Sequence, residues 1–194
     1  FVLMTAMPPT TGHLQLIQFA ASLTTPVVVL VNTQPGEPYP HERYRALVGA
    51  VKAAGLETSV TVYHMHETIE QNPEAPGFWD MWRKILTDLG FVPGDYIVAS
   101  ETYGKRLAEE VGGVFFPYDI DRSINTAKAT GVRANPWREF DRMLPEFRKV
   151  LRTTVTVFGA ESTGKTTLSR GLAGLLNAHW IFEYARPHLE NTST

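Results

Sequence analysis

The chain has 194 residues, of which 43% are hydrophobic and 20% charged, and its formal net charge is −2. These values describe a soluble globular protein with enough apolar mass for a sizeable core, and they exclude intrinsic disorder. The absence of cysteine excludes disulfides, thiolate zinc sites and cysteine nucleophiles, and the slightly acidic balance offers no footprint for nucleic acid. No run approaches the roughly 18 apolar residues of a membrane span, and the N-terminus lacks the features of a signal peptide. We therefore expect a cytoplasmic protein whose partners are small molecules.

Short β-branched runs alternate along the chain with amphipathic stretches. Strands are predicted at 1–5, 26–31, 60–63, 96–99 and 114–118, and helices at 13–23, 44–51, 79–89 and 103–111. This alternation is typical of a parallel sheet with crossover helices, so we expect a Rossmann-like α/β domain. In such a sheet, ligands bind outside the carboxyl ends of the strands, which makes the loop after the first strand the first place to look for a site.

That loop reads AMPPTTGH over residues 6–13. Its prolines stiffen the chain, Thr10 is able to cap the next helix, and Gly12 permits close approach of the backbone to a ligand. His13 falls in the first helical turn, where a ring N–H can bind an anion that the helix dipole also favours. The loop therefore predicts a phosphate site.

Residues 135–152 are charged and punctuated by proline, which indicates a linker. Four apolar residues in it recur at near-helical spacing, so the segment is expected to be helical and to pack on the first domain. They are Trp137, Phe140, Leu144 and Phe147.

Residues 153–166 read TTVTVFGAESTGKT, a β-branched run followed by the GxxxxGK[ST] loop of P-loop nucleotide-binding proteins. In this loop Gly159 and Gly164 let backbone N–H groups face phosphate oxygens, Lys165 supplies a positive charge, and Thr166 offers a hydroxyl to Mg²⁺. A strand is expected at 153–158, a helix at 165–176 and a second strand at 180–183.

The P-loop stands close to the end of the sequence, with only 28 residues after Thr166. A P-loop domain needs several further strand and helix units, so this tail is expected to be the first βαβ part of a truncated kinase domain. The first residue is Phe1 and not methionine. Both observations suggest a fragment of a longer polypeptide.

Thr10-x-Gly12-His13 after a first strand resembles the [HT]xGH signature of the nucleotidylyltransferase superfamily. With the P-loop tail, the chain resembles the NadR-type bifunctional enzymes, which join a nicotinamide-mononucleotide adenylyltransferase to a ribosylnicotinamide kinase. The resemblance rests on the order of six segments: MPPTTGHLQLIQFA at 7–20, HERYRAL at 41–47, SETYGKRLA at 100–108, YDIDR at 118–122, ATGVRANPWREF at 129–140 and FGAESTGKTTL at 158–168.

The resemblance implies three regions: a Rossmann-like nucleotidylyltransferase domain at 1–134, a helical linker at 135–152, and a partial P-loop kinase domain at 153–194. It further implies adenylyl transfer from ATP to nicotinamide mononucleotide, giving NAD⁺ and pyrophosphate with the help of Mg²⁺. No covalent enzyme intermediate is needed, because positioning and charge stabilisation carry such reactions.

The resemblance also assigns roles to residues. His13 and Thr10 are expected to contact the transferring phosphoryl group, with helix N–H groups near Gly12 assisting. The triphosphate signature of the family falls at 127–133, where Thr130 and Arg133 are retained and Lys128 replaces a serine. These three residues are expected to hold the β and γ phosphates.

Two tryptophans lie where the resemblance places the nicotinamide pocket. The electron-rich indole faces of Trp79 and Trp82 suit a cationic pyridinium ring, and plain helix packing is the alternative interpretation of both residues.

Thr10 is a departure from close relatives, which more often carry histidine there. Glu183 and Arg186 resemble the family's kinase substrate region and are expected to be idle without the rest of that domain.

A pair of histidines follows the strand predicted at 60–63. His64 and His66 have the i, i+2 spacing that places two side chains on one face of a strand. A metal site would need His41 or Glu67 to be brought beside them, so a strand-end pair without metal is the preferred interpretation.

Three alternatives to the adenylyltransferase stay open. The chain could act as a ribosylnicotinamide kinase through its P-loop, or as a nucleotidylyltransferase with another acceptor such as phosphopantetheine, a flavin nucleotide or a cytidylyl substrate, or as a nucleotide-sensing regulator. The resemblance favours the amide over the acid mononucleotide. The sequence leaves the oligomeric state open, with a homo-oligomer among the possibilities.

Overall fold

The computed structural model describes residues 1–121, 123–124 and 129–182. The chain divides into two compact units, Phe1–Leu151 and Arg152–Thr194. The first unit therefore extends beyond the domain expected at 1–134 and includes the helical segment that follows it.

The first unit contains a parallel sheet. Strands β1 (Val2–Met4), β2 (Val27–Thr33) and β3 (Val60–His66) pair in parallel, as do β4 (Tyr96–Ala99) and β5 (Val114–Pro117). Two hydrogen bonds join β4 to the start of the chain, because the Val98 N–H donates to the Phe1 carbonyl at 2.9 Å and the Phe1 amino group donates to the Tyr96 carbonyl at 2.6 Å. The strand order is thus β3-β2-β1-β4-β5, and the predicted Rossmann-like fold is confirmed.

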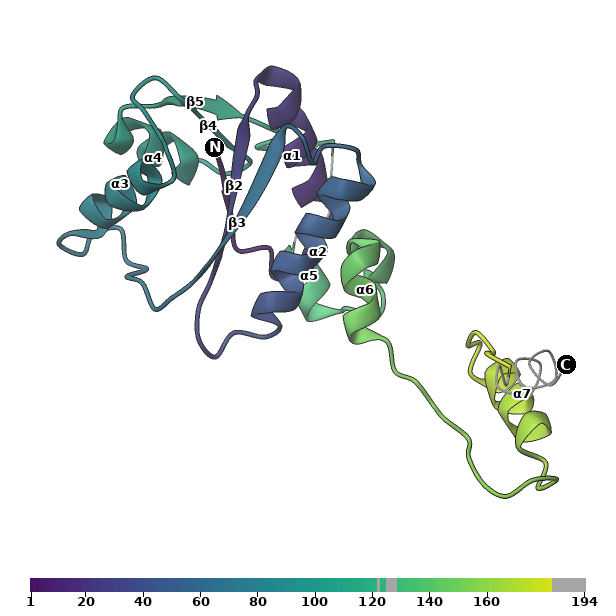
Figure 1. The fold of residues 1–194 in the computed structure, drawn as a ribbon. Coiled ribbons are helices and arrows are strands. Elements are labelled where there is room, and N and C mark those ends of the chain that lie inside the picture. Colours follow the sequence, from purple (N-terminus) through teal and green to yellow (C-terminus); the bar gives the residue numbers. More distant parts are fainter. Residues whose placement is uncertain (122, 125–128, 183–194) are drawn as a thin grey trace, which may run out of the picture. The chain divides into compact units, whose positions relative to one another are not determined.

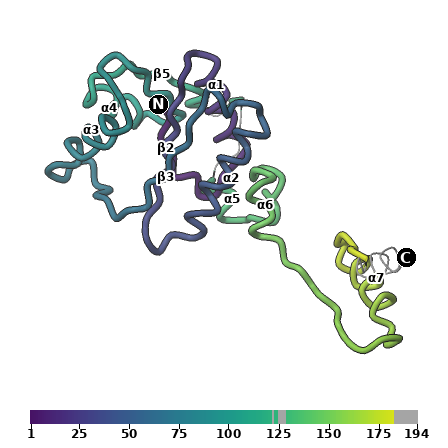
Figure 2. The backbone as a smooth tube through the Cα atoms, in the orientation of Figure 1, coloured from purple at the N-terminus to yellow at the C-terminus, as the bar shows by residue number. Residues whose placement is uncertain are grey.

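Alternating side chains of the strands bury two separate cores. Val29 of β2 and Val2 of β1 belong to the core under helices α1, α2 and α6, whereas Leu30 of β2 belongs to the core under α3 and α4. The backbone trace shows these two sets of helices on opposite sides of the strands (Figures 1 and 2). The helices are α1 (Thr11–Leu23), α2 (Pro40–Ala53), α3 (Phe78–Asp88), α4 (Tyr103–Val111), α5 (Ala129–Ala134), the 3₁₀ turn η1 (Phe140–Arg142) and α6 (Pro145–Leu151).

Several elements are longer than their sequence patterns predict, and the largest differences are in β3 and α2. β3 continues to His66 because it pairs with β2 residue by residue, ending with Thr33 opposite His66. α2 begins at Pro40, since proline is well suited to the first helical position, where its missing N–H is not needed. The histidine pair therefore lies at the carboxyl end of β3, as expected, and His66 is the last residue of the strand.

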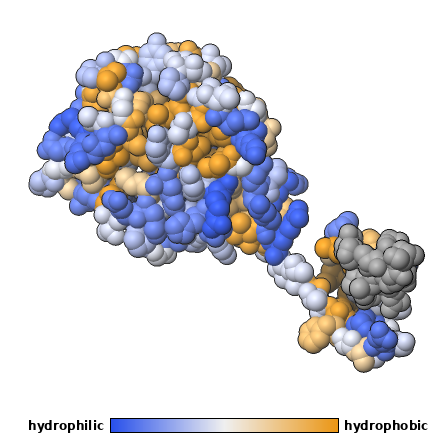
Figure 3. All heavy atoms as spheres, in the orientation of Figure 1, coloured by the Kyte–Doolittle hydropathy of each residue, from blue (hydrophilic) through white to orange (hydrophobic). Residues whose placement is uncertain are grey.

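The second unit contains one helix, α7 (Lys165–Leu175). The strands expected at 153–158 and 180–183 are absent from the described residues of this unit, because neither segment has a strand beside it to complete its backbone hydrogen bonds. No residue of α7 is buried. Apolar side chains of this unit lie at its surface (Figure 3), among them Val155, Phe158, Leu175 and Ile181.

None of the helices in the described part of the chain combines the length and the apolar composition needed to cross a membrane.

Candidate active site

The TTGH segment connects the carboxyl end of β1 to the N-terminus of α1. Thr10 is the N-cap residue of α1, with extended backbone angles (φ −120°, ψ 165°), and it is buried. Its backbone N–H donates to Nδ1 of His13 at 2.9 Å, and its hydroxyl oxygen lies 2.9 Å from the same nitrogen. The side chain at the third helical position thus returns to the N-cap backbone, as a glutamate does in a capping box.

This hydrogen bond fixes the chemistry of the imidazole. Nδ1 of His13 accepts the Thr10 N–H, so in the neutral ring the proton is on Nε2. His13 therefore presents an N–H donor at the helix N-terminus, where the dipole also favours negative charge. Such an arrangement can stabilise charge on a phosphoryl group, and it provides no nucleophile.

Arg133 of α5 reaches the same loop. Its guanidinium donates to the carbonyl of Met7, between β1 and Thr10, and to the hydroxyl of Thr130 at 3.1 Å. The structure thus brings Arg133 and Thr130 to the TTGH loop from about 120 residues further along the chain. Gly12 lies in the first turn of α1, and Lys128 lies outside the described residues.

A clamp that the sequence did not reveal holds the TTGH loop from the other side. Met143 forms an isolated antiparallel bridge with Thr10, and the Leu144 N–H donates to the Pro9 carbonyl at 3.0 Å. Both clamp residues are fully buried, and Nε of Arg148 donates to the Met143 carbonyl at 3.0 Å. The apolar spacing of this segment predicted that it packs on the domain, but nothing local indicates that it touches the loop.

The two tryptophans have different surroundings. Trp82 is buried in the core under α3 and α4, and its indole N–H has no partner among the described residues. Trp79 is half-buried, stacks on Tyr103 with ring centroids 5.8 Å apart, and lies 5.4 Å below the Arg106 guanidinium. Burial raises the pKa of Tyr103 to about 12, so its phenol is neutral at physiological pH. Trp79 is therefore the better placed of the two to face a ligand.

The P-loop has the curved backbone that its sequence predicts. Ser162 and Gly164 both have positive φ, at 61° and 80°, and Gly164 is the N-cap of α7. Lys165 donates from Nζ to the Ala160 carbonyl at 2.5 Å, so its ammonium group bonds to the backbone of the P-loop itself. Thr166 follows in the first turn of α7, and Glu183 and Arg186 lie outside the described residues.

The histidine pair of β3 is part of a larger cluster. The His41 ring of α2 lies 5.3 Å from each of the rings of His64 and His66. Sequence reasoning named these three residues but missed Thr33, whose buried hydroxyl lies 2.9 Å from a nitrogen of each β3 histidine. Among the described residues no three histidine, cysteine, aspartate or glutamate side chains are arranged to hold a metal ion.

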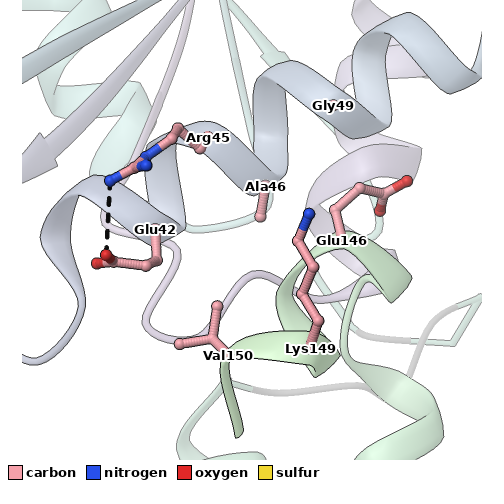
Figure 4. Close-up of a pocket in the computed structure, with 7 residues that line it drawn as sticks. All are labelled: Glu42, Arg45, Ala46, Gly49, Glu146, Lys149 and Val150. Atoms are coloured by element: carbon pink, nitrogen blue, oxygen red, sulfur yellow. Dashed lines mark ion pairs between the residues drawn. The ribbon is translucent and has the colours of Figure 1, made fainter. Parts of the chain in front are cut away.

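A pocket of about 180 Å³ lies between α2 and α6 (Figure 4). It has mixed charge, with Glu42 paired to Arg45 at 3.6 Å on α2 and the side chains of Glu146 and Lys149 on α6. None of the residues predicted to bind a nucleotide lines it. We therefore do not assign it to the candidate active site.

Comparison with known proteins supports the resemblance to NadR-type proteins. No family model matches the chain. It is 24% identical over 199 aligned positions to the trifunctional NAD biosynthesis/regulator protein NadR of Escherichia coli K12, and equally to that of Salmonella typhimurium LT2, covering 94% of this chain and 47% of each relative. The chain thus spans about half the length of the curated relatives it matches.

Solved structures give a closer match. The chain is 28% identical, with a TM-score of 0.69, to NadR protein in complex with NR and to NadR protein in complex with NAD and AMP-PNP. These alignments cover all of this chain and 56% and 57% of the solved ones. The resemblance to NadR-type proteins that the motif order predicted is confirmed, and it extends along the whole chain.

Proposed function

We propose that the first unit transfers the adenylyl group of ATP to nicotinamide mononucleotide, forming NAD⁺ and releasing pyrophosphate. The observation that carries the proposal is the Thr10–His13 hydrogen bond at 2.9 Å, at the carboxyl edge of a sheet with the order β3-β2-β1-β4-β5. The order reverses beside β1, so the TTGH loop lies at the switch point where α/β sheets bind their ligands. The similarity to NadR proteins, one of them in complex with NAD and AMP-PNP, supports the choice of substrates.

In this proposal the 5′-phosphate of the mononucleotide attacks the α-phosphorus of ATP in line. The Nε2–H of His13 donates to the phosphoryl oxygen on which charge develops, and the Thr10 N–H keeps the imidazole in the tautomer that can donate. Arg133 and Thr130 bind the β and γ phosphates, which leave as pyrophosphate. Mg²⁺ accompanies ATP and spreads the charge of the leaving group.

The loop is held by contacts from two distant segments of the chain. Arg133 donates to the carbonyl of Met7, and Met143 and Leu144 hold Thr10 and Pro9 from the opposite side. A preorganised donor costs no reorganisation in the transition state, which is why a stiff loop suits this chemistry. Trp79 offers its indole to the nicotinamide ring, and Lys128 is a further proposed triphosphate ligand.

The test is product analysis after incubation of the chain with ATP, Mg²⁺ and a panel of acceptors. The panel contains nicotinamide mononucleotide, nicotinic acid mononucleotide, phosphopantetheine and flavin mononucleotide. We expect NAD⁺ and pyrophosphate in equal amounts, with the amide preferred. A dinucleotide product from another acceptor alone would assign the same chemistry to a different substrate, and no product from any acceptor would refute the proposed transfer.

A ribosylnicotinamide kinase is the second candidate for the longer proteins that contain this sequence pattern. It is favoured by the P-loop at 159–166 and by the similar NadR protein in complex with NR. For this chain we propose only the adenylyl transfer, because residues 152–182 include no strand to support the P-loop.

A further inference from the structure

The His41, His64 and His66 side chains, here called the histidine cluster, gather at the carboxyl ends of β2 and β3. Their ring centroids are 5.3, 5.3 and 5.8 Å apart. β2 lies between β3 and β1, so the cluster lies on the ligand-binding edge of the sheet, two strands away from the strand that carries the TTGH loop. The proposed adenylyl transfer does not use these three side chains.

The two β3 rings are held in fixed orientations by one hydroxyl. Oγ1 of Thr33 lies 2.9 Å from Nε2 of His64, 2.9 Å from Nδ1 of His66 and 3.3 Å from the carbonyl of Met65. Each ring directs one nitrogen towards Thr33, so its second nitrogen points away from that hydroxyl. The Tyr44 ring stacks on His64 at 5.0 Å with an interplanar angle of 8°, which restricts rotation further.

The charged neighbours that shift the pKa of His64 are positive. Burial lowers the pKa of His64 from its ordinary value of 6.5, and repulsion from His41, His66 and Arg43 lowers it further. Arg43 is buried and pairs with Glu37 at 2.5 Å, while its Nε and Nη1 have no partner in the described part of the chain. Repulsion from these positive groups thus disfavours protonation of His64 in the empty protein.

The carboxylates around the cluster are three glutamates, two of which are engaged by arginines. Glu37 precedes α2 and is engaged by Arg43, and the exposed Glu67 directly follows β3. Glu42 is directed to Arg45. The full set of ionisable side chains consists of Glu37, His41, Glu42, Arg43, Tyr44, Arg45, His64, His66 and Glu67. Because repulsion lowers the pKa of His64 in the empty protein, a bound anion would favour its protonated form.

A metal ion does not fit the arrangement. Nε2 of His64 and Nδ1 of His66 both face the Thr33 hydroxyl, and the described residues contain no group suited to metal binding. A tetrahedral oxyanion suits the chemistry of the three rings, because imidazole N–H groups donate to it and its charge stabilises their protonated forms. We propose that the histidine cluster is a phosphate-binding subsite, which becomes protonated as it binds its ligand.

The probes are sulfate and inorganic phosphate, added to the full chain at constant ionic strength while the histidine ring resonances are followed by NMR. Sulfate keeps its charge between pH 5 and 8, so a change in its affinity reports protonation of the protein. We expect both anions to shift the resonances of all three rings and sulfate to bind about tenfold more tightly at pH 6 than at pH 8. Equal sulfate affinity at the two pH values would contradict the proposal.

The matched variants are His41→Gln and His66→Gln, compared with His179→Gln. His41 and His179 are both exposed, but His179 belongs to the second unit and serves as the control. Anion affinity should fall about tenfold in each cluster variant, as expected for a charge-assisted hydrogen bond, and stay unchanged in the control. Retained affinity in the exposed His41→Gln variant would overturn the proposal even if His66→Gln failed to fold.

Three further ligands, nicotinamide mononucleotide, its nucleoside and pyrophosphate, identify the source of the phosphate. If nicotinamide mononucleotide shifts the ring resonances and its nucleoside does not, the subsite takes the nucleotide's phosphate. If only inorganic phosphate and pyrophosphate do so, it takes the released product. Both results support a phosphate subsite, whereas equal shifts from the nucleoside would refute it. The measurement is repeated in His13→Ala, so loss of adenylyl transfer and loss of the subsite are observed separately.

Discussion

Each unit of the chain places a phosphate-loop sequence at the N-terminus of a helix, but the two loops differ in the tertiary contacts that hold them. The TTGH loop follows β1, which is paired on both sides, and Arg133 and the Met143–Leu144 clamp hold it in place. The P-loop follows a segment that forms no strand, and Lys165 bonds only to its own loop. The more distinctive motif thus lies in the less organised unit, which teaches that a motif predicts chemistry only when tertiary contacts fix its geometry.

The largest effect is expected from His13→Ala. Removing a preorganised donor to a developing phosphoryl charge should lower adenylyl transfer by about 100-fold or more. Steady-state kinetics with ATP and nicotinamide mononucleotide provide the measurement, and His179→Ala in the second unit is the control. Full activity in His13→Ala would remove the TTGH loop from the mechanism and weaken the contrast between the two units.

The next effect concerns stability and uses one substitution in both units. Leu144→Ala removes a fully buried side chain of the clamp and should cost about 2 to 5 kcal/mol of unfolding free energy. Leu175→Ala changes a residue that is 82% exposed at the end of α7 and should cost less than about 0.5 kcal/mol. Urea unfolding followed by tryptophan fluorescence measures both values. Equal costs would show that the second unit has a core of its own.

Arg133→Ala should weaken ATP binding and slow the reaction by about tenfold or more, because a charge-assisted hydrogen bond to the leaving group is lost. Arg106→Ala, which changes an exposed cation above Trp79, tests the acceptor side in parallel. We expect the KM for ATP to rise in the first variant and the KM for the mononucleotide to rise in the second. The opposite pattern would exchange the two substrate sites.

The smallest effect is expected at the P-loop. Lys165→Ala should leave adenylyl transfer unchanged, and the unmodified chain should form no mononucleotide from ribosylnicotinamide, ATP and Mg²⁺. The reason is that no strand in residues 152–182 supports the loop and no residue of α7 is buried. Robust phosphorylation that disappears in Lys165→Ala would reverse our comparison of the two loops.

Local sequence patterns predicted the features of the fold that depend on residues close together in the chain. The five strands and four helices of the sheet follow from hydrophobic periodicity, and the TTGH loop is a contiguous sequence, so both were predictable. The clamp was not, because the contact between Thr10 and Met143 depends on how distant segments fold together. Thr33 escaped notice for the same reason, since only the register of β2 and β3 places it beside the histidines. The expected strands do not form at 153–158 or in the described part of the second segment, 180–182, because β propensity alone does not pair a segment with a neighbour.

The bridge between Thr10 and Met143 also sets a time at which the loop can be completed during synthesis. About 130 residues separate the two partners, and ribosomes add about 5 to 20 residues per second, so the loop must wait roughly 6 to 26 seconds for its clamp. During that interval β1 and β2 can already pair, but Pro9 and Thr10 have no partners from the clamp. A growing chain therefore completes its last strand, which ends at Pro117, before it makes Met143 and Leu144, and the phosphate loop is completed only when these two residues have been added.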